Sequence, residues 1–232
     1  MRKIAISDIH GCAITFKALV EDRLQLTKTD ELFLLGDYVD RGPNSKGVFD
    51  YIFQLQNDGY TVRCLRGNHE NMMLDARSGS PADFDHWRDN GGDSTLASFG
   101  ILFDLNKIPE KYWQFCETLP YYFELDQHLL VHAGFNFLHP RGPLKDEDSM
   151  VWIRNWYEDL DREWLGNRII IHGHTPRNRR QIEAWPMTQS EIPILNIDCG
   201  CFFTGQMCAY DMSNDRLYFQ ENLDMSTEEY WY

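Results

Sequence analysis

Short apolar runs recur along the chain, and each is too short for an ordinary helix. They are rich in leucine, isoleucine and valine, and such runs are typical of strands that are buried on both faces. The predicted strands are Lys3–Ser7, Glu31–Leu35, Thr61–Leu65, His128–Val131, Arg168–Ile171 and Ile194–Ile197.

Helical patterns separate the first three strands. Phe16–Leu26 and Val48–Gln56 are predicted helices, so the first third of the chain alternates between strand and helix. This alternation is typical of an α/β fold with parallel strands. The stretch from 72 to 119 reads as helical or irregular.

The last third changes character. Met207–Asp211 and Arg216–Gln220, joined through residues 213–215, predict an antiparallel hairpin. Because no linker interrupts the chain, we expect a single domain over residues 1–224. We expect the acidic and aromatic residues 225–232 to form a loosely attached tail.

Composition and charge narrow the possible partners. The chain has 232 residues, 43% of them hydrophobic, which is enough for a proper core. Its formal net charge of −14 repels polyanions, so nucleic acid is not expected as an obligate partner. No apolar run approaches the ~20 residues of a membrane span. No obligate protein partner is evident.

The cysteines indicate a reducing compartment. Six are scattered along the chain, and only Cys199 and Cys201 lie close together, which fits neither a disulfide framework nor a zinc ribbon. Asp8 interrupts the N-terminal apolar run too early for a signal peptide. We therefore expect a cytoplasmic protein with reduced, mostly buried thiols.

Five of the predicted strands end in Asp, Asn or His beside at least one glycine. The segments are Asp8-Ile9-His10-Gly11, Gly36-Asp37-Tyr38-Val39-Asp40-Arg41-Gly42, Gly67-Asn68-His69-Glu70, His132-Ala133-Gly134 and His172-Gly173-His174-Thr175. In open α/β sheets, sites assemble at the carboxyl ends of strands, and glycines there allow sharp turns. Five of the eight histidines lie in these segments, which indicates a metal site.

Each motif alone also has a structural explanation. Asp8 and His10 could be a turn pair, His132 a core histidine, and Asn68 the cap of a helix. All five motifs supply carboxylate, amide or imidazole groups, which are typical ligands of divalent metals. Their conjunction in one short chain therefore favours the metal site.

In this order the motifs resemble those of the calcineurin-like metallophosphoesterases. More narrowly, they resemble the phosphoprotein phosphatase branch, which includes phage and bacterial serine/threonine phosphatases and diadenosine tetraphosphatases. The resemblance runs from Asp8 to about Gly205 and includes Val151–Arg154 and Ile197–Gly200. It implies an α/β fold, an α-β-β-α sandwich with a dinuclear metal site at the carboxyl ends of its strands.

The resemblance also assigns the metal ligands. It places Asp8, His10 and Asp37 on the first ion, and Asp37, Asn68, His132 and His174 on the second. A bridging carboxylate holds two cations close, and neutral ligands complete the shell without excess charge. We expect two divalent ions, with Mn²⁺ first and Fe or Zn²⁺ open.

The remaining motif residues receive roles from the same resemblance. His69 would protonate the leaving group, with Asp40 orienting it and raising its pKa. Arg41 and Arg154 would hold the phosphate oxygens, and hydroxide held by the metals would attack phosphorus directly. His172 is expected to support the ligands or to be purely structural.

The substrate is less constrained than the chemistry. We expect hydrolysis of phosphate monoesters on a phosphoprotein, with phosphoserine and phosphothreonine first. The alternatives are a symmetrical bis(5'-nucleosyl)-tetraphosphatase, a broad-specificity nucleotide phosphoesterase, and an inactive scaffold. Trp87 lies in a segment that could shape specificity. It could pack a base or a peptide, or be buried beside a tight turn.

Overall fold

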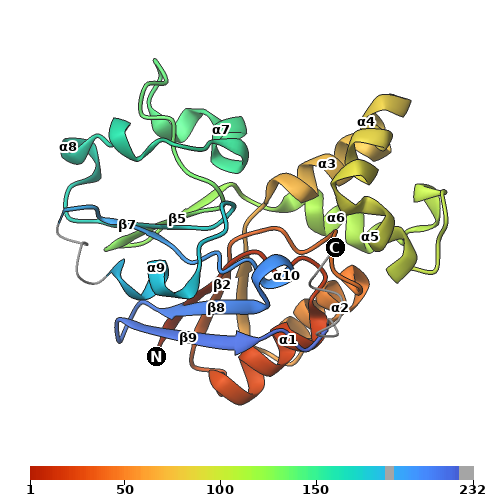
Figure 1. The fold of residues 1–232 in the computed structure, drawn as a ribbon, viewed down its shortest axis with the longest axis horizontal. Coiled ribbons are helices and arrows are strands. Elements are labelled where there is room, and N and C mark those ends of the chain that lie inside the picture. Colours follow the sequence, from red (N-terminus) through yellow and green to blue (C-terminus); the bar gives the residue numbers. More distant parts are fainter. Residues whose placement is uncertain (186–190, 225–232) are drawn as a thin grey trace.

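Two sheets form the centre of the computed structural model, which describes residues 1–185 and 191–224 (Figure 1). The predicted tail at 225–232 lies outside the described residues. The first sheet has the strand order β3-β2-β1-β8-β9 and the second has β4-β5-β6-β7. The strands are β1 Lys3–Ile6, β2 Glu31–Leu34, β3 Thr61–Cys64, β4 Tyr122–Glu124, β5 His128–Val131, β6 Ile169–His172, β7 Ile194–Asn196, β8 Gln206–Asp211 and β9 Arg216–Glu221.

Strand directions agree with the prediction from the sequence. β1, β2 and β3 are parallel to one another, as are β5, β6 and β7. β8 and β9 form the predicted antiparallel hairpin, with Asp211 opposite Arg216. β8 also pairs with β1, so the hairpin extends the first sheet.

The central strands of each sheet are buried on both faces, which explains why they read as continuous apolar runs. In β1, Ile4 and Ile6 pack with the helices of the first sheet, while Ala5 faces the second sheet. In β5, Leu130 faces the first sheet and Leu129 packs on the opposite side. Alternation along each strand therefore builds two helix-covered outer layers and one inter-sheet core.

Helices cover the outer faces of the sandwich. In Figure 1, α7 and α8 lie above the sheet that contains β5 and β7, while α1 and α2 lie on the far side of the sheet that contains β2 and β8. This confirms the predicted α-β-β-α arrangement. The helices are α1 Ala13–Ala18, α2 Ser45–Asn57, α3 Asn68–Ser78, α4 Pro81–Trp87, α5 Asp93–Ser98, α6 Glu110–Thr118, α7 Glu147–Trp152, α8 Arg162–Leu165, α9 Arg179–Glu183 and α10 Cys201–Thr204.

Short turns of other helix types join these elements. Leu19–Arg23 and Arg88–Gly92 are π-helical turns, and Leu105–Lys107, Pro143–Lys145 and Tyr157–Asp159 are 3₁₀ turns. None of the described helices is long and apolar enough to cross a membrane. All six cysteines are buried, as predicted.

The prediction was wrong in two places. The first helix begins at Ala13 rather than Phe16 and passes at Leu19 into a π-helical turn that ends at Arg23. The short strand β4 was missed, because its residues are partly or fully exposed and give no strong apolar signal.

Candidate metal centre

The six predicted metal ligands lie together where the carboxyl ends of the two sheets meet. The loops after β1, β2 and β3 carry four of them, and the segments after β5 and β6 carry the other two. These side chains, all buried, are Asp8, His10, Asp37, Asn68, His132 and His174. The two sheets thus contribute to one site, as the sequence predicted.

The loops that carry these residues adopt uncommon backbone conformations. Nine non-glycine residues of the described chain have positive φ angles, and six of the nine belong to the predicted site. These six are Asp8, His10, Asp37, Asp40, Arg41 and His174. Such conformations cost energy and persist where the surroundings hold them, which is common at functional sites.

Two glycines allow the backbone to approach the ligands closely. A Cβ atom on Gly67 would collide with the Asp37 carboxylate, and one on Gly173 would collide with Ser7 and Asp8. Any larger residue would push these side chains apart, so the glycines of the motifs follow from the packing of the site.

Two sets of three side chains bring their donor atoms close enough to hold a metal ion. The donor atoms of His10, Asp37 and His69 all lie within 4.8 Å of one another. Those of Asp37, His132 and His174 do so as well. Asp37 belongs to both sets, which is the position expected of a bridging carboxylate.

Asp8 belongs to neither of these two sets, although it was expected on the first ion. Its carboxylate accepts hydrogen bonds from the Ser7 hydroxyl and from the backbone N–H of His174, the latter at 3.1 and 3.2 Å. Burial raises the pKa of Asp37 and of Asp198 well above the ordinary value, and the charge of Asp8 raises both further. Asp8 therefore adds negative charge at the centre, and its place as a ligand stays a prediction.

Two imidazoles present lone pairs to the centre. Burial lowers the pKa of His10 and of His132, so both rings are neutral. The Nδ1 atom of His10 lies 3.0 Å from the carbonyl of Val39, and that of His132 lies 2.9 Å from the carbonyl of Leu35. Because a carbonyl only accepts, the ring proton sits on Nδ1 in both, and Nε2 carries the lone pair that a metal ion would use.

The donor atoms at the second set fit a bound cation. His132 Nε2 lies 3.0 Å from Asn68 Oδ1 and 3.5 Å from an oxygen of Asp37. His174 Nδ1 is also 3.0 Å from Asn68 Oδ1, and its buried Nε2 has no hydrogen-bond partner within the described residues. Carboxylate, amide and imidazole donors that converge in this way suit a divalent metal.

His69 is held by a buried carboxylate, as predicted. Its Nδ1 lies 2.7 Å from Asp40 Oδ2. Burial lowers the pKa of His69, and Arg41 and His132 lower it further. The expectation that Asp40 raises this pKa is therefore wrong, because burial dominates. Burial also raises the pKa of Asp40 to about 8, against hydrogen bonds from neighbouring side chains that lower it.

Two residues without a predicted catalytic role hold Asp40. The indole N–H of Trp87 donates to both of its carboxylate oxygens, at 2.9 and 3.0 Å, and the Thr95 hydroxyl donates at 2.7 Å. Trp87 is fully buried, so it does not pack a base or a peptide. The alternative that Trp87 is buried is confirmed, but no signal in the sequence indicated that its indole holds Asp40. Thr95 gave no signal either.

Glu70 ties the loop after β2 to the start of α3, a role that the sequence did not reveal. Its carboxylate accepts hydrogen bonds from the backbone N–H groups of Asp37, Tyr38 and Gly67 at 2.8–2.9 Å. Gly67 occupies the cap position of α3, so Asn68 is not the cap and its side chain faces the centre. The sequence signal that could have revealed this role is a Glu at the third position of the helix, where its carboxylate reaches back to the backbone at the cap.

The two predicted phosphate ligands flank the centre. Arg41 donates from Nη1 to His10 Nε2 at 2.8 Å. Arg154 is exposed and donates to the hydroxyl of Thr175, the residue after His174, at 3.0 Å. Both guanidinium groups are therefore near the ligands, and neither is tied to a carboxylate by a described ion pair.

His172 belongs to neither ligand set. Its Nδ1 lies 2.9 Å from the carbonyl of Gly173, and its Nε2 lies 2.5 Å from the hydroxyl of Tyr157. Burial lowers its pKa to about 3. His172 therefore stays neutral and faces Tyr157, which agrees with the supporting role expected for it.

Comparison with known proteins identifies relatives of the whole chain. Residues 1–202 match the model of the calcineurin-like phosphoesterase family. Serine/threonine-protein phosphatase 1 of Salmonella typhimurium is 30% identical over 208 residues, which cover 87% of this chain and 88% of that protein. The asymmetrical bis(5'-nucleosyl)-tetraphosphatase PrpE of Bacillus subtilis is 28% identical over 229 residues, covering 88% of each.

A solved structure supports the fold. A protein serine/threonine phosphatase from Saccharomyces cerevisiae matches with a TM-score of 0.66 at 14% identity, covering 98% of this chain and 82% of that one. At this identity the likeness concerns the fold alone.

Proposed function

The chain belongs to the calcineurin-like phosphoesterase family, and from that premise we propose that it hydrolyses phosphoserine and phosphothreonine side chains of proteins with the help of two divalent metal ions. The observation that carries the proposal is the sharing of Asp37 between two ligand sets. The His69–Asp40 pair and two arginines surround these sets. The full-length relative from Salmonella, named a serine/threonine-protein phosphatase, supports the choice of substrate.

The proposed ligands are Asp8, His10 and Asp37 for one ion, and Asp37, Asn68, His132 and His174 for the other. Ions held there would supply Lewis acidity at the phosphoryl group and favour deprotonation of an attacking water. Mn²⁺ is proposed as the metal, because carboxylate and amide oxygens suit it, and Fe or Zn²⁺, which imidazoles favour, is the alternative. Divalent ions require ligands that carry lone pairs, which the carboxylate of Asp37 and the neutral imidazoles of His10 and His132 provide.

His69 is proposed to deliver a proton to the leaving alkoxide. Asp40 engages Nδ1, so the ring is fixed with Nε2 toward the centre, 4.0 Å from Asp37. Trp87 and Thr95 hold Asp40 in turn, which limits the motion of the pair. Arg41 and Arg154 can each donate two hydrogen bonds to phosphate oxygens and offset negative charge in the transition state.

A second candidate function is supported by the relatives named PrpE. These are asymmetrical bis(5'-nucleosyl)-tetraphosphatases, whereas the alternative expected from the sequence was the symmetrical activity. The two differ in products, since symmetrical cleavage of diadenosine tetraphosphate gives ADP alone and asymmetrical cleavage gives ATP and AMP. We also propose a cytoplasmic location, which the scattered spacing and the burial of the six cysteines support.

One assay panel tests the proposal. The protein, loaded with Mn²⁺, is given a phosphoserine peptide, nitrophenyl phosphate and diadenosine tetraphosphate, with Asp37→Asn as the inactive control. We expect kcat/KM to be highest for the peptide. A higher value for the dinucleotide would select the second function, and its products would identify the mode of cleavage. Inactivity on all three substrates would favour the alternative that the protein is an inactive scaffold.

A further inference from the structure

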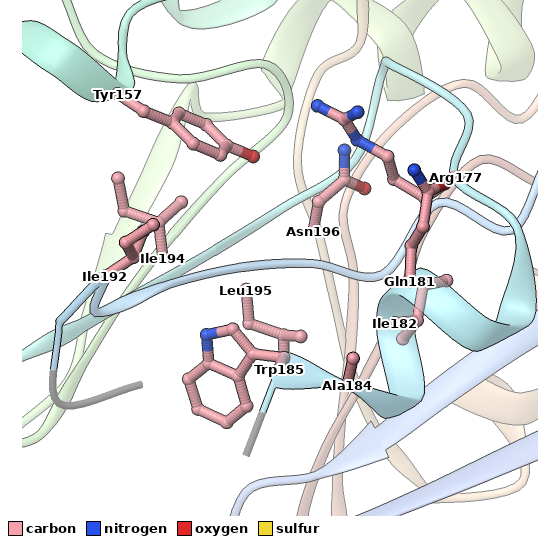
Figure 2. A pocket seen from close by; sticks show the side chains of 10 residues that line it. All are labelled: Tyr157, Arg177, Gln181, Ile182, Ala184, Trp185, Ile192, Ile194, Leu195 and Asn196. Atoms are coloured by element: carbon pink, nitrogen blue, oxygen red, sulfur yellow. The ribbon is translucent and has the colours of Figure 1, made fainter. Parts of the chain in front are cut away.

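Two hollows lie side by side next to Arg154. The first, of about 430 Å³, is lined by residues that include Arg154, His172 and Thr175 and therefore adjoins the metal centre. The second, of about 350 Å³, lies between α9 and β7 (Figure 2). Tyr157 and Arg177 line both, so the two hollows are neighbours.

The second hollow is largely apolar. Its lining includes Ile182, Trp185, Ile192, Ile194 and Leu195, which surround the open space in Figure 2. Ile192 is 42% exposed, whereas the other four of these side chains are buried. An apolar surface that is open to solvent beside a charged centre is typical of a ligand-binding site.

Two of the polar side chains that line this hollow, Tyr157 and Asn196, are already engaged in hydrogen bonds. The Tyr157 hydroxyl bonds to His172, and Asn196 donates to the carbonyl of Thr175 at 2.8 Å and accepts from the N–H of Asp198 at 2.8 Å. These groups hold the wall in place and have little capacity left to read the edge of a nucleobase. Burial of an apolar group is the interaction that the hollow offers.

We propose that the hollow between α9 and β7 is a specificity subsite for an apolar side chain of a phosphopeptide, close in sequence to the phosphorylated residue. This inference rests on the proposed phosphoprotein phosphatase function and deepens it. The phosphoryl group would lie between the metal centre and Arg154, and the peptide would pass Tyr157 and Arg177 into the apolar hollow.

Charge and size agree with this occupant. Arg154 and Arg177 line the path on a chain whose formal net charge is −14, so this path is locally suited to a phosphorylated ligand. The hollow is near the lower end of the ~300–1,000 Å³ of small-ligand pockets, which suits a side chain rather than a folded partner.

The test uses labelled phosphoserine peptides in a glycine and serine background. A single leucine is moved through the positions that flank the phosphoserine, and binding to the Mn²⁺-loaded protein is measured by fluorescence anisotropy. We expect at least one leucine peptide to bind about 10-fold more tightly than the parent, as burial of one apolar side chain predicts.

Two variants and a matched control locate the effect. Ile192→Glu places a charge at the hollow, and Ala184→Phe fills it from an exposed position. Both are expected to abolish the preference for leucine. Leu102→Glu changes an apolar side chain that is 79% exposed and lies outside the hollow, and it should keep the preference.

The outcomes separate the subsite from the proposed function. Equal binding of all peptides by the unaltered protein, or a preference that survives both variants, would overturn the subsite. If the two variants weaken binding of diadenosine tetraphosphate and leave binding of the leucine peptide unchanged, the hollow binds a nucleoside. This result would also overturn the peptide subsite. If the preference is present but bound peptide is not dephosphorylated, the proposed function fails and the subsite stands.

Discussion

His69 could serve this centre in two ways, as a proton donor or as a metal ligand. Its ring nitrogen lies within reach of His10 and Asp37, which would suit a ligand. Its Nδ1 is engaged by Asp40 at 2.7 Å, which suits an oriented acid. We expect His69 to act as the proton donor, because the contact with Asp40 fixes the ring with its other nitrogen available for proton transfer.

The variant His69→Asn distinguishes these roles. We expect it to retain its metal content, measured by elemental analysis, and to lose ~10²–10⁴-fold in kcat, because proton transfer contributes on that scale. His86→Asn is the control, since His86 is exposed and lies outside both ligand sets. Loss of metal from His69→Asn would show that His69 is a ligand and that our assignment is wrong.

Glu70 supports the ligands without facing them. Burial raises its pKa to about 7, while hydrogen bonds from the backbone of Tyr38, Gly67 and Asp37 lower it. In Glu70→Gln, an amide N–H would face at least one of these N–H donors. We expect the free energy of unfolding to fall by ~2–3 kcal/mol in urea with metal chelated. The exposed Glu163→Gln should stay within ~0.5 kcal/mol, and an equal effect of both would contradict this role.

At the residue scale, local motifs revealed the ligands but not their support. An Asp, Asn or His beside a glycine after an apolar run is visible in the sequence, and these side chains do converge. The hydrogen bonds from Trp87 and Thr95 to Asp40 depend on how residues 72–119 fold back onto the β2 loop. No local pattern encodes that packing.

Among the elements, the start of the first sheet is held by a partly buried ion pair. The Arg2 guanidinium lies 2.7 Å from an oxygen of Asp30, just before β2, and Thr27 donates two further hydrogen bonds to this carboxylate. The hydrogen bond from Arg2 is the largest cause that holds the pKa of Asp30 well below its usual range. This carboxylate therefore stabilises the fold in its ionised form.

The variant Asp30→Asn tests this contribution as a function of pH. A lowered folded-state pKa gives stability that is present above the unfolded value near 4 and is lost as the pH falls below it. We expect the variant to lose ~1–2 kcal/mol at pH 7, with the difference shrinking below pH 4. The control Glu183→Gln breaks the exposed ion pair with Arg179, and it should lower the free energy of unfolding by ~0.5 kcal/mol or less. A deficit for Asp30→Asn that does not change with pH would contradict the linkage.

The strands were the most predictable elements, because burial on both faces leaves continuous apolar runs. The six predicted runs and the hairpin coincide with strands to within a residue or two. The half-exposed β4 lacks that signal, and the π-helical turn at Leu19–Arg23 depends on packing against the sheet. Division of the strands into two sheets came from the family resemblance, since apolar runs alone do not state which strands pair.

At the scale of the whole molecule, the metal centre joins the two sheets of the sandwich. Asp37 and Asn68 follow strands of the first sheet, whereas His132 and His174 follow strands of the second. Ions bound between them would link the two halves, in addition to the apolar core between the sheets. Metal binding should therefore stabilise the entire fold rather than a single loop.

Removal of metal tests this link. At a free concentration 100-fold above Kd, one ion contributes ~2.7 kcal/mol. For a chain of this length, that corresponds to a rise in Tm of roughly 5–10 °C per ion. We expect EDTA to lower Tm by at least this amount in the Mn²⁺-loaded protein and to have little effect on Asp37→Asn, which lacks the shared carboxylate.

The control Asp126→Asn, at an exposed position, should respond as the unaltered protein does. An unchanged Tm on chelation of a protein proven to contain metal would mean that the ions do not hold the sheets together.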